Sequence, residues 1–473
     1  MPAPFWLYLS GVVAAVVVSF AALAVFYWRR PGYRRRPGGR ARPRVAVSGT
    51  AFARLPTHPY LLTTVRVLSV GAFVLVVAVG FFGEQNAFRN PASVFVWQLW
   101  WTGMVLVSAF LGNLWALINP WKIIFSWAEA LHHRARPGGE PRPRRRYPAH
   151  LGAWPAVVLF LVFAWMALVW QGTATPAALA SAVALYSLAT WLGMAVFGKH
   201  RWLRRGEAFA VVFTLLARFA PTQARPNGPQ SGQGPGWSLR LPASGLLDGR
   251  PLHPSLMALV LLVLAAAVFE GLGDTPVWSG IMDRVIADSA LWPLWSALER
   301  LGLGLFAAVK TVAWVLFAPL FVAAYLTVSA GVARAGGGRL STGGVACRLA
   351  LTLVPVILAY HLAHELVHLP VAARALVALA ADPFGLGWRP FGASAAQGKA
   401  GTVDAALAWS VTVAAVAAGH ALAVCLALAA ASRAFGDPRV ALRSQYPMMV
   451  FVSAHAALSL WILSRPIVGY AGG

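Results

Sequence analysis

The sequence predicts an all-α protein, a polytopic transmembrane helical bundle of about ten spans with both termini non-cytoplasmic. The first reason is composition: 59% of the 473 residues are hydrophobic and only 11% are charged, roughly half the charged fraction of a soluble domain. The second is that apolar stretches of about 20 residues, enough to cross a bilayer core, recur along nearly the whole chain. The third is the uneven distribution of Lys and Arg among the loops.

The predicted spans form a single transmembrane domain over residues 1–473. They lie near residues 5–28, 60–83, 94–118, 150–170, 177–197, 254–272, 302–328, 349–370, 404–431 and 447–464. The first span has no basic segment before it and is too long for the apolar part of a signal peptide, so we expect it to be retained. Because proline interrupts helices, Pro120 is expected to close the third span and Pro370 the eighth.

Most of the 39 Lys and Arg residues fall in the loops after the first, third, fifth, seventh and ninth spans. By the positive-inside rule these loops are cytoplasmic, which places both termini on the opposite side. The longest are the predicted basic cytoplasmic loops 29–59, 122–149 and 198–253. Because the net charge of +25 is divided among loops instead of forming one face, we expect the lipid bilayer and its anionic lipids as partners, and no nucleic acid.

Two segments outside the spans have apolar residues at helical spacing. Glu207–Ala220 is expected to lie in the cytoplasmic interface, and Ile281–Arg300 is expected to cap the outer face. The two cysteines have neither a nearby partner nor a CxxC spacing. We therefore expect no disulfide framework and no thiolate metal site.

Four ionisable residues of the eighth span follow the i, i+3, i+4, i+7 spacing: His361, His364, Glu365 and His368. This spacing places them on one face of a helix. Ionisable groups are costly inside a membrane and indicate a function or a partner within the bundle. His364-Glu365-Leu-Val-His368 also matches the HExxH pattern, in which two histidines bind zinc and the glutamate acts as general base.

Two further histidines lie at a depth similar to that of His361, namely His420 in the ninth span and His455 in the tenth. Three helices therefore offer an imidazole in the middle or inner half of the membrane. We expect His361, His364, His368, His420 and His455 to be candidate ligands of a transition metal such as zinc, copper or iron, with a haem as a further possibility. The alternative for an isolated histidine is a hydrogen bond to a neighbouring helix.

Three other polar residues could belong to the same site. Asp382 begins the outer-loop segment Asp382–Trp388 and is a candidate catalytic group together with Glu365, or alternatively the cap of an Asx turn. Glu270, at the outer end of the sixth span, and Lys310, in the seventh, could face a polar cavity. Alternatively, Glu270 lies at the interface and Lys310 snorkels to it.

Several segments share their order and spacing with one known family. They are Pro4-Phe5-Trp6, Asn113–Lys122, Gly206–Pro221, Tyr360-His361 with His364, Asp382–Trp388 with Phe391-Gly392, Gly419-His420 and Arg443–Pro447. Over essentially the full length the chain resembles a bacterial and archaeal family of polytopic membrane proteins known as fenitrothion hydrolases. The resemblance implies hydrolysis of an organophosphate ester by a membrane-bound complex in the prokaryotic cytoplasmic membrane. It also implies His361, His364, Asp382 and His420 as site residues, whereas Glu365 and His368 lie outside the family's pattern.

The sequence leaves three functions open. The first is a metal-dependent hydrolase of ester or organophosphate-type substrates, in which a bound metal activates water. The second is a non-enzymatic membrane subunit of a larger complex, acting as an anchor, a metal or haem carrier, or a transporter. The third is an intramembrane zinc protease built on the HExxH residues of the eighth span.

Overall fold

The computed structural model describes residues 4–29, 45–46, 58–135, 145–170, 175–225, 236–248, 250–300, 302, 304–388 and 404–465. Within these residues, ten helical segments are long and apolar enough to cross a membrane. The predicted all-α polytopic bundle is therefore confirmed. The arginine-rich segments 30–44 and 136–144 and the pair Phe391-Gly392 lie outside the described residues.

The spans are built on ten long helical segments. They are α1 (Phe5–Arg29), α3 (Pro59–Phe82), the run of α4 (Pro91–Val94), η3 (Phe95–Thr102) and α5 (Gly103–Phe110), α8 (Trp154–Leu168), α9 (Pro176–Phe197), α12 (Pro254–Gly273), α15 (Leu305–Ala335), α17 (Val354–Ala380), α18 (Ala405–Phe435) and α20 (Tyr446–Leu463). Short helices α16 (Thr342–Leu349) and η8 (Ala350–Leu353) lead into α17, and α19 (Pro438–Ser444) leads into α20.

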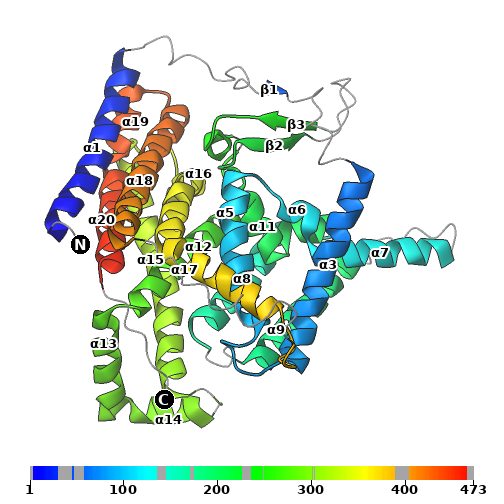
Figure 1. Cartoon of the computed structure of the whole chain (residues 1–473). Coiled ribbons are helices and arrows are strands. Elements are labelled where there is room, and N and C mark those ends of the chain that lie inside the picture. The colour runs from blue at the N-terminus through cyan, green and yellow to red at the C-terminus, as the bar shows by residue number, and fades with distance from the viewer. Residues whose placement is uncertain are drawn as a thin grey trace.

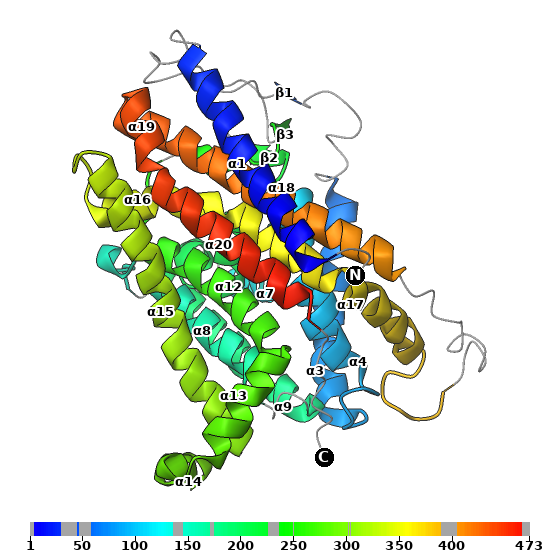
Figure 2. The ribbon, with the colours of Figure 1, turned by 90° about the vertical axis from the view of Figure 1, so that its left-hand side faces the viewer.

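Helices α12 and α17 occupy the centre of the bundle, between two groups of helices (Figures 1 and 2). On one side, α1, α18 and α20 contact one another, and α15 contacts α20. On the other side, α3 contacts α9, while α11 (Ala208–Leu216) contacts α5 and α8. Helix α12 contacts α8, α15 and α17, and α17 contacts both α18 and η3. The two central helices therefore connect the groups, and a side chain between them is surrounded by protein.

A small antiparallel sheet lies at one end of the bundle, with the order β1-β3-β2 (Figure 1). Strand β1 (Val45–Ala46) follows the first span, whereas β2 (Thr222–Arg225) and β3 (Gly236–Leu239) follow the fifth. Because β1 pairs with β3, these two predicted cytoplasmic loops meet at the same end, as the alternation of charge requires. Which side of the membrane this end faces stays a prediction.

The opposite end carries two short helices, α13 (Pro276–Ala287) and α14 (Trp292–Arg300), joined by η7 (Ser289–Leu291) (Figure 1). They cover the predicted amphipathic segment Ile281–Arg300. Val277 and Trp292 are exposed, whereas Trp295 is buried against α13 and donates a hydrogen bond to the carbonyl of Val285.

The expectation for Pro120 was wrong. The third span already ends at Phe110, and Pro120 is the first residue of α7 (Pro120–Ala135). Proline is favoured at this position because the first amide of a helix has no intrahelical acceptor. Asn119 precedes it and accepts a hydrogen bond from the Lys122 amide.

The expected end of the helix at Pro370 was also wrong, although the part that is long and apolar enough to cross a membrane ends nearby, at Leu366. Helix α17 continues through Pro370 to Ala380. A proline inside a helix removes one backbone hydrogen bond, a loss that membrane helices accommodate through neighbouring contacts. As a consequence, His361, His364, Glu365 and His368 lie in the middle of a long helix and not at its end.

The expected interfacial position of Glu207–Ala220 was a third error, because α11 is buried in the bundle. Its N-terminus is satisfied internally: the Glu207 carboxylate accepts hydrogen bonds from the amides of Phe209 and Ala210 and from the Tyr186 hydroxyl. Burial raises the pKa of Glu207, and these hydrogen bonds act in the opposite direction. With its end groups paired in this way, an apolar helix of nine residues can be buried.

Candidate metal site

A cavity of about 360 Å³ lies between the central helices α12 and α17, with η3 and α8 forming its remaining walls. Its polar wall comes from the two central helices and the residue after α12. The side chains are Glu270, Asp274, His361, His364, Glu365 and His368. Aromatic residues of η3 and α8, among them Trp97, Trp101 and Phe163, form the apolar wall. The cavity thus combines acidic and imidazole groups with a largely aromatic lining.

All four ionisable residues predicted to share one face of α17 line this cavity and so face the bundle interior, but His420 and His455, which we expected at the same site, are not among the lining residues. His364 is central: its ring stacks on Tyr360, with centroids 6.1 Å apart, and lies 5.6 Å from the ring of His368. His361 lies one turn deeper and is buried. Its Nε2 has no hydrogen-bond partner among the described residues, and its ring meets that of Trp101 edge-on.

The close approach of α12 to α17 depends on Gly271. A Cβ atom at this position would lie 1.8 Å from the Tyr360 hydroxyl oxygen and 2.8 Å from Ile462 Cγ2. Only glycine leaves room for this contact. The contact holds the preceding residue, Glu270, at the cavity, and the Glu270 side chain is exposed to it. Sequence reasoning allowed either the interface or a polar cavity for Glu270, and the cavity is its position.

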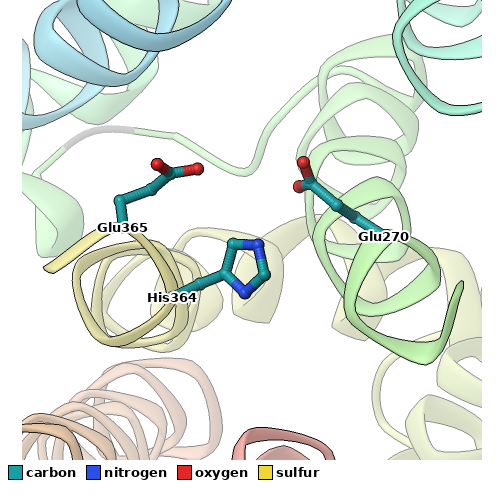
Figure 3. A group of neighbouring side chains, drawn as sticks. All are labelled: Glu270, His364 and Glu365. Atoms are coloured by element: carbon teal, nitrogen blue, oxygen red, sulfur yellow. The ribbon is translucent and has the colours of Figure 1, made fainter. Parts of the chain in front are cut away.

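Glu270, His364 and Glu365 form a group with the geometry of a metal site. One ligand atom from each lies within 4.8 Å of the other two, and Figure 3 shows the two carboxylates and the imidazole converging from α12 and α17. Ligands about 2.1 Å from a tetrahedral zinc ion lie roughly 3.4 Å apart, so the three ligand atoms are somewhat more widely spaced than in an occupied site. Within the described residues neither carboxylate has an ion-pair partner. The group is therefore a candidate site for a divalent cation.

The segment η3 opposite these residues is a π-helix of eight residues. Such π-helical segments are rare overall, but those that occur are often found at functional sites. The wider turn changes which side chains share a face. Here the π-helix contributes Trp97, Gln98 and Trp101 to the cavity. Sequence reasoning missed Gln98, since hydrophobic periodicity contains no signal for a π-helical turn.

His420 and His455 form a pair of their own and are not among the residues that line the cavity. His420 Nδ1 lies 2.7 Å from the Val416 carbonyl oxygen, and His420 Nε2 lies 3.1 Å from His455 Nδ1. In neutral rings, therefore, His420 donates to the carbonyl and His455 donates to His420. Ser459 Oγ also lies 3.2 Å from His455 Nδ1. This geometry matches the alternative expectation, a hydrogen bond between neighbouring helices.

Asp382 organises the turn that follows α17. Its carboxylate accepts hydrogen bonds from the backbone amides of Leu386, Gly387 and Trp388. Gly385 and Gly387 in this turn have φ values of +74° and +82°, which glycine adopts readily. Asp382 does not line the cavity, and its contacts match the Asx-turn alternative and not a catalytic role.

Comparisons of the chain with known protein families, with curated proteins and with solved structures found no match. The fold and the cavity define a class, a multi-pass helical membrane protein with a candidate metal site between its central helices. The geometry of that site is the basis for the functional proposal.

Proposed function

We propose that the chain is a membrane-embedded hydrolase that binds a divalent transition metal ion through Glu270, His364 and Glu365. The observation that carries this proposal is the convergence of two carboxylates and one imidazole, from two helices, within 4.8 Å. Such oxygen and nitrogen ligands favour zinc or iron(II) over copper(I), which prefers sulfur. A bound divalent cation supplies Lewis acidity and lowers the pKa of a bound water toward neutrality.

The rest of the cavity suits a small substrate. Its volume of about 360 Å³ is near the lower end of the range typical of ligand pockets. Trp97 and Trp101 offer apolar contact, while Gln98 and His361 offer hydrogen-bonding groups. An ester or organophosphate-type substrate is proposed because the chain resembles the fenitrothion hydrolases in motifs that include His361 and His364.

The geometry favours this proposal over an intramembrane zinc protease. An HExxH site needs His364 and His368 on the metal, with the glutamate outside the ligand set as general base. Here Glu365 belongs to the converging group, together with Glu270, whereas His368 lies outside it. A cavity of about 360 Å³ between packed helices also offers little room for an extended peptide.

We place the protein in the prokaryotic cytoplasmic membrane with the sheet end of the bundle on the cytoplasmic side. The charge alternation supports this orientation, and the arginine-rich loops would contact anionic headgroups there. Other subunits of a membrane complex belong to the same proposal, since the resemblance implies them.

Elemental analysis of the detergent-purified protein, paired with assays on small aryl esters and phosphotriesters, tests the function. We expect one or more equivalents of zinc or iron and measurable hydrolysis. Glu270→Gln and His364→Ala should lose both, while the exposed residues Glu299 and His150 provide matched controls as Glu299→Gln and His150→Ala. Metal without hydrolysis would instead indicate a metal-carrying subunit, and a haem spectrum or the absence of metal would contradict the proposal.

A further inference from the structure

Helix α7 has an apolar face and a polar face on opposite sides. Ile124, Trp127 and Leu131 follow the i, i+3, i+7 spacing and share one face. Ser126 and Glu129 lie on the opposite face, because each residue turns a helix by about 100°. The helix has 16 residues, and it is not among the described helices that are long and apolar enough to cross a membrane. Helix α7 is therefore amphipathic and is not a span.

The polar face of α7 is held by the bundle. Lys199, which follows the fifth span, forms an ion pair with Glu129 and donates a hydrogen bond to Ser126 Oγ over 2.9 Å. At the start of α7, Trp121 is buried, and its indole nitrogen donates a hydrogen bond to Ser187 Oγ on α9 over 2.7 Å. These contacts fix the rotation of α7 about its own axis. The apolar face is consequently turned away from Lys199.

The apolar face is largely uncovered by the described part of the chain. Ile124 is half-buried, whereas Trp127 is 45% exposed and Leu131 is 68% exposed. Figure 1 shows why: α7 runs sideways from the bundle, across the direction of the neighbouring span α3. Large apolar side chains gain free energy when they leave water. The exposed face therefore requires an apolar environment outside the bundle.

The position and the charge of α7 both indicate a lipid surface. Helix α7 follows the third span, and Lys199 follows the fifth, so both lie where the spans end on the side of the sheet. Tryptophan is enriched at this boundary between acyl chains and water. The last turn of α7 contains His132, His133 and Arg134, whereas its single acidic residue, Glu129, is paired with Lys199. The uncompensated charge of the helix is thus positive and complements anionic headgroups.

We propose that α7 is an interfacial helix that binds the anionic lipid leaflet at the sheet end of the bundle. Trp127 and Leu131 insert among the acyl chains, Arg134 lies at the headgroups, and Lys199 anchors the opposite face to the protein. Helices of this kind lie in the membrane plane with the apolar face about 5–10 Å below the headgroup boundary. This surface is separate from the metal site and does not depend on it.

Spin labelling of the full-length protein in lipid nanodiscs tests the insertion. Cys347 and Cys425 are replaced by alanine, and labels are attached at Leu131→Cys on the apolar face and at His133→Cys on the polar face. Leu188→Cys, at an exposed position of the fifth span, is the lipid-facing reference. We expect the labels at 131 and 188 to be relaxed by oxygen, which concentrates among acyl chains, and protected from a water-soluble nickel chelate. The label at 133 should show the reverse.

Two results at position 131 would overturn the proposal. A label that the nickel chelate relaxes would place the apolar face in water. An immobilised label protected from both reagents would show that protein, and not lipid, covers this face. Neither result would affect the metal site, which the metal analysis tests separately.

Lipid composition tests the preference for anionic headgroups. We expect the label at 131 to lie deeper in nanodiscs of phosphatidylcholine with phosphatidylglycerol than in phosphatidylcholine alone, and Arg134→Gln to remove most of this difference. Arg300 is exposed on α14 at the other end of the bundle, so Arg300→Gln is the matched control and should retain the difference. Equal depth in the two kinds of nanodisc, or a difference unchanged by Arg134→Gln, would overturn the role of anionic lipid.

Discussion

Glu270 on α12 and Glu365 on α17 place carboxylate oxygens within 4.8 Å of each other across the central cavity, and both lie within that distance of the His364 ring (Figure 3). Two carboxylates at this separation repel each other unless a proton or a cation lies between them. In a water-poor environment that repulsion is weakly screened. Replacing one of these two carboxylates therefore tests directly whether a metal ion lies between them.

Glu365→Gln tests whether Glu365 is a ligand. Loss of a residue that only hydrogen-bonds to a metal ligand lowers metal affinity about 10–100-fold. Loss of a direct ligand should cost more, so we expect Glu365→Gln to bind zinc more than a hundredfold more weakly. Isothermal titration with zinc measures this change, and Glu299→Gln should bind as the wild-type protein does. If Glu365→Gln instead kept its metal and lost only activity, Glu365 would be a general base, as in an HExxH site.

His361→Ala separates substrate binding from metal binding. His361 Nε2 is buried at the cavity wall and has no partner among the described residues, so it is available to a substrate. Losing one such hydrogen bond costs about 1 kcal/mol, or roughly fivefold in KM. We expect metal occupancy to be unchanged and His361→Gln to restore part of the KM. Loss of metal in His361→Ala would make His361 a ligand, as the histidine pattern of the sequence predicts.

The spans and the polar face of α17 could be predicted because both depend on local periodicity. Apolar runs of bilayer length fix the number of crossings, and the spacing of His361, His364, Glu365 and His368 fixes their common face. The partner of that face could not be predicted in the same way. Glu270 was recognised only as a candidate, because its contact with α17 depends on Gly271 and Tyr360, residues 89 positions apart whose packing no local pattern reveals.

The errors have a common physical cause, which is that tertiary contacts override local signals. Pro370 did not end α17, and Pro120 started a helix instead of closing one. Segment α11 looked amphipathic, yet it is buried because Glu207, Tyr186 and backbone amides satisfy one another. The π-helical turn that brings Gln98 to the cavity has no counterpart in hydrophobic periodicity.

Cysteine labelling tests the orientation of the bundle. Glu84 follows the second span and Arg201 follows the fifth, and both side chains are exposed. In a background with Cys347 and Cys425 replaced by alanine, we expect a membrane-impermeant maleimide to label Glu84→Cys in intact cells and Arg201→Cys only after lysis. Both positions should react in detergent, which controls for accessibility. The reverse pattern would place the arginine-rich loops outside and contradict the charge argument.

The last prediction concerns the His420–His455 pair, whose role we expect to be structural. His420→Ala removes the acceptor of His455 and the donor to the Val416 carbonyl. Losing two buried hydrogen bonds of about 1 kcal/mol each and the packing of the buried ring should lower the melting temperature in detergent by several degrees. Metal content and KM should stay at wild-type values when measured below the new melting temperature. Because His420 lies outside the cavity lining, a loss of metal from the folded His420→Ala protein would show instead that the pair belongs to the metal site.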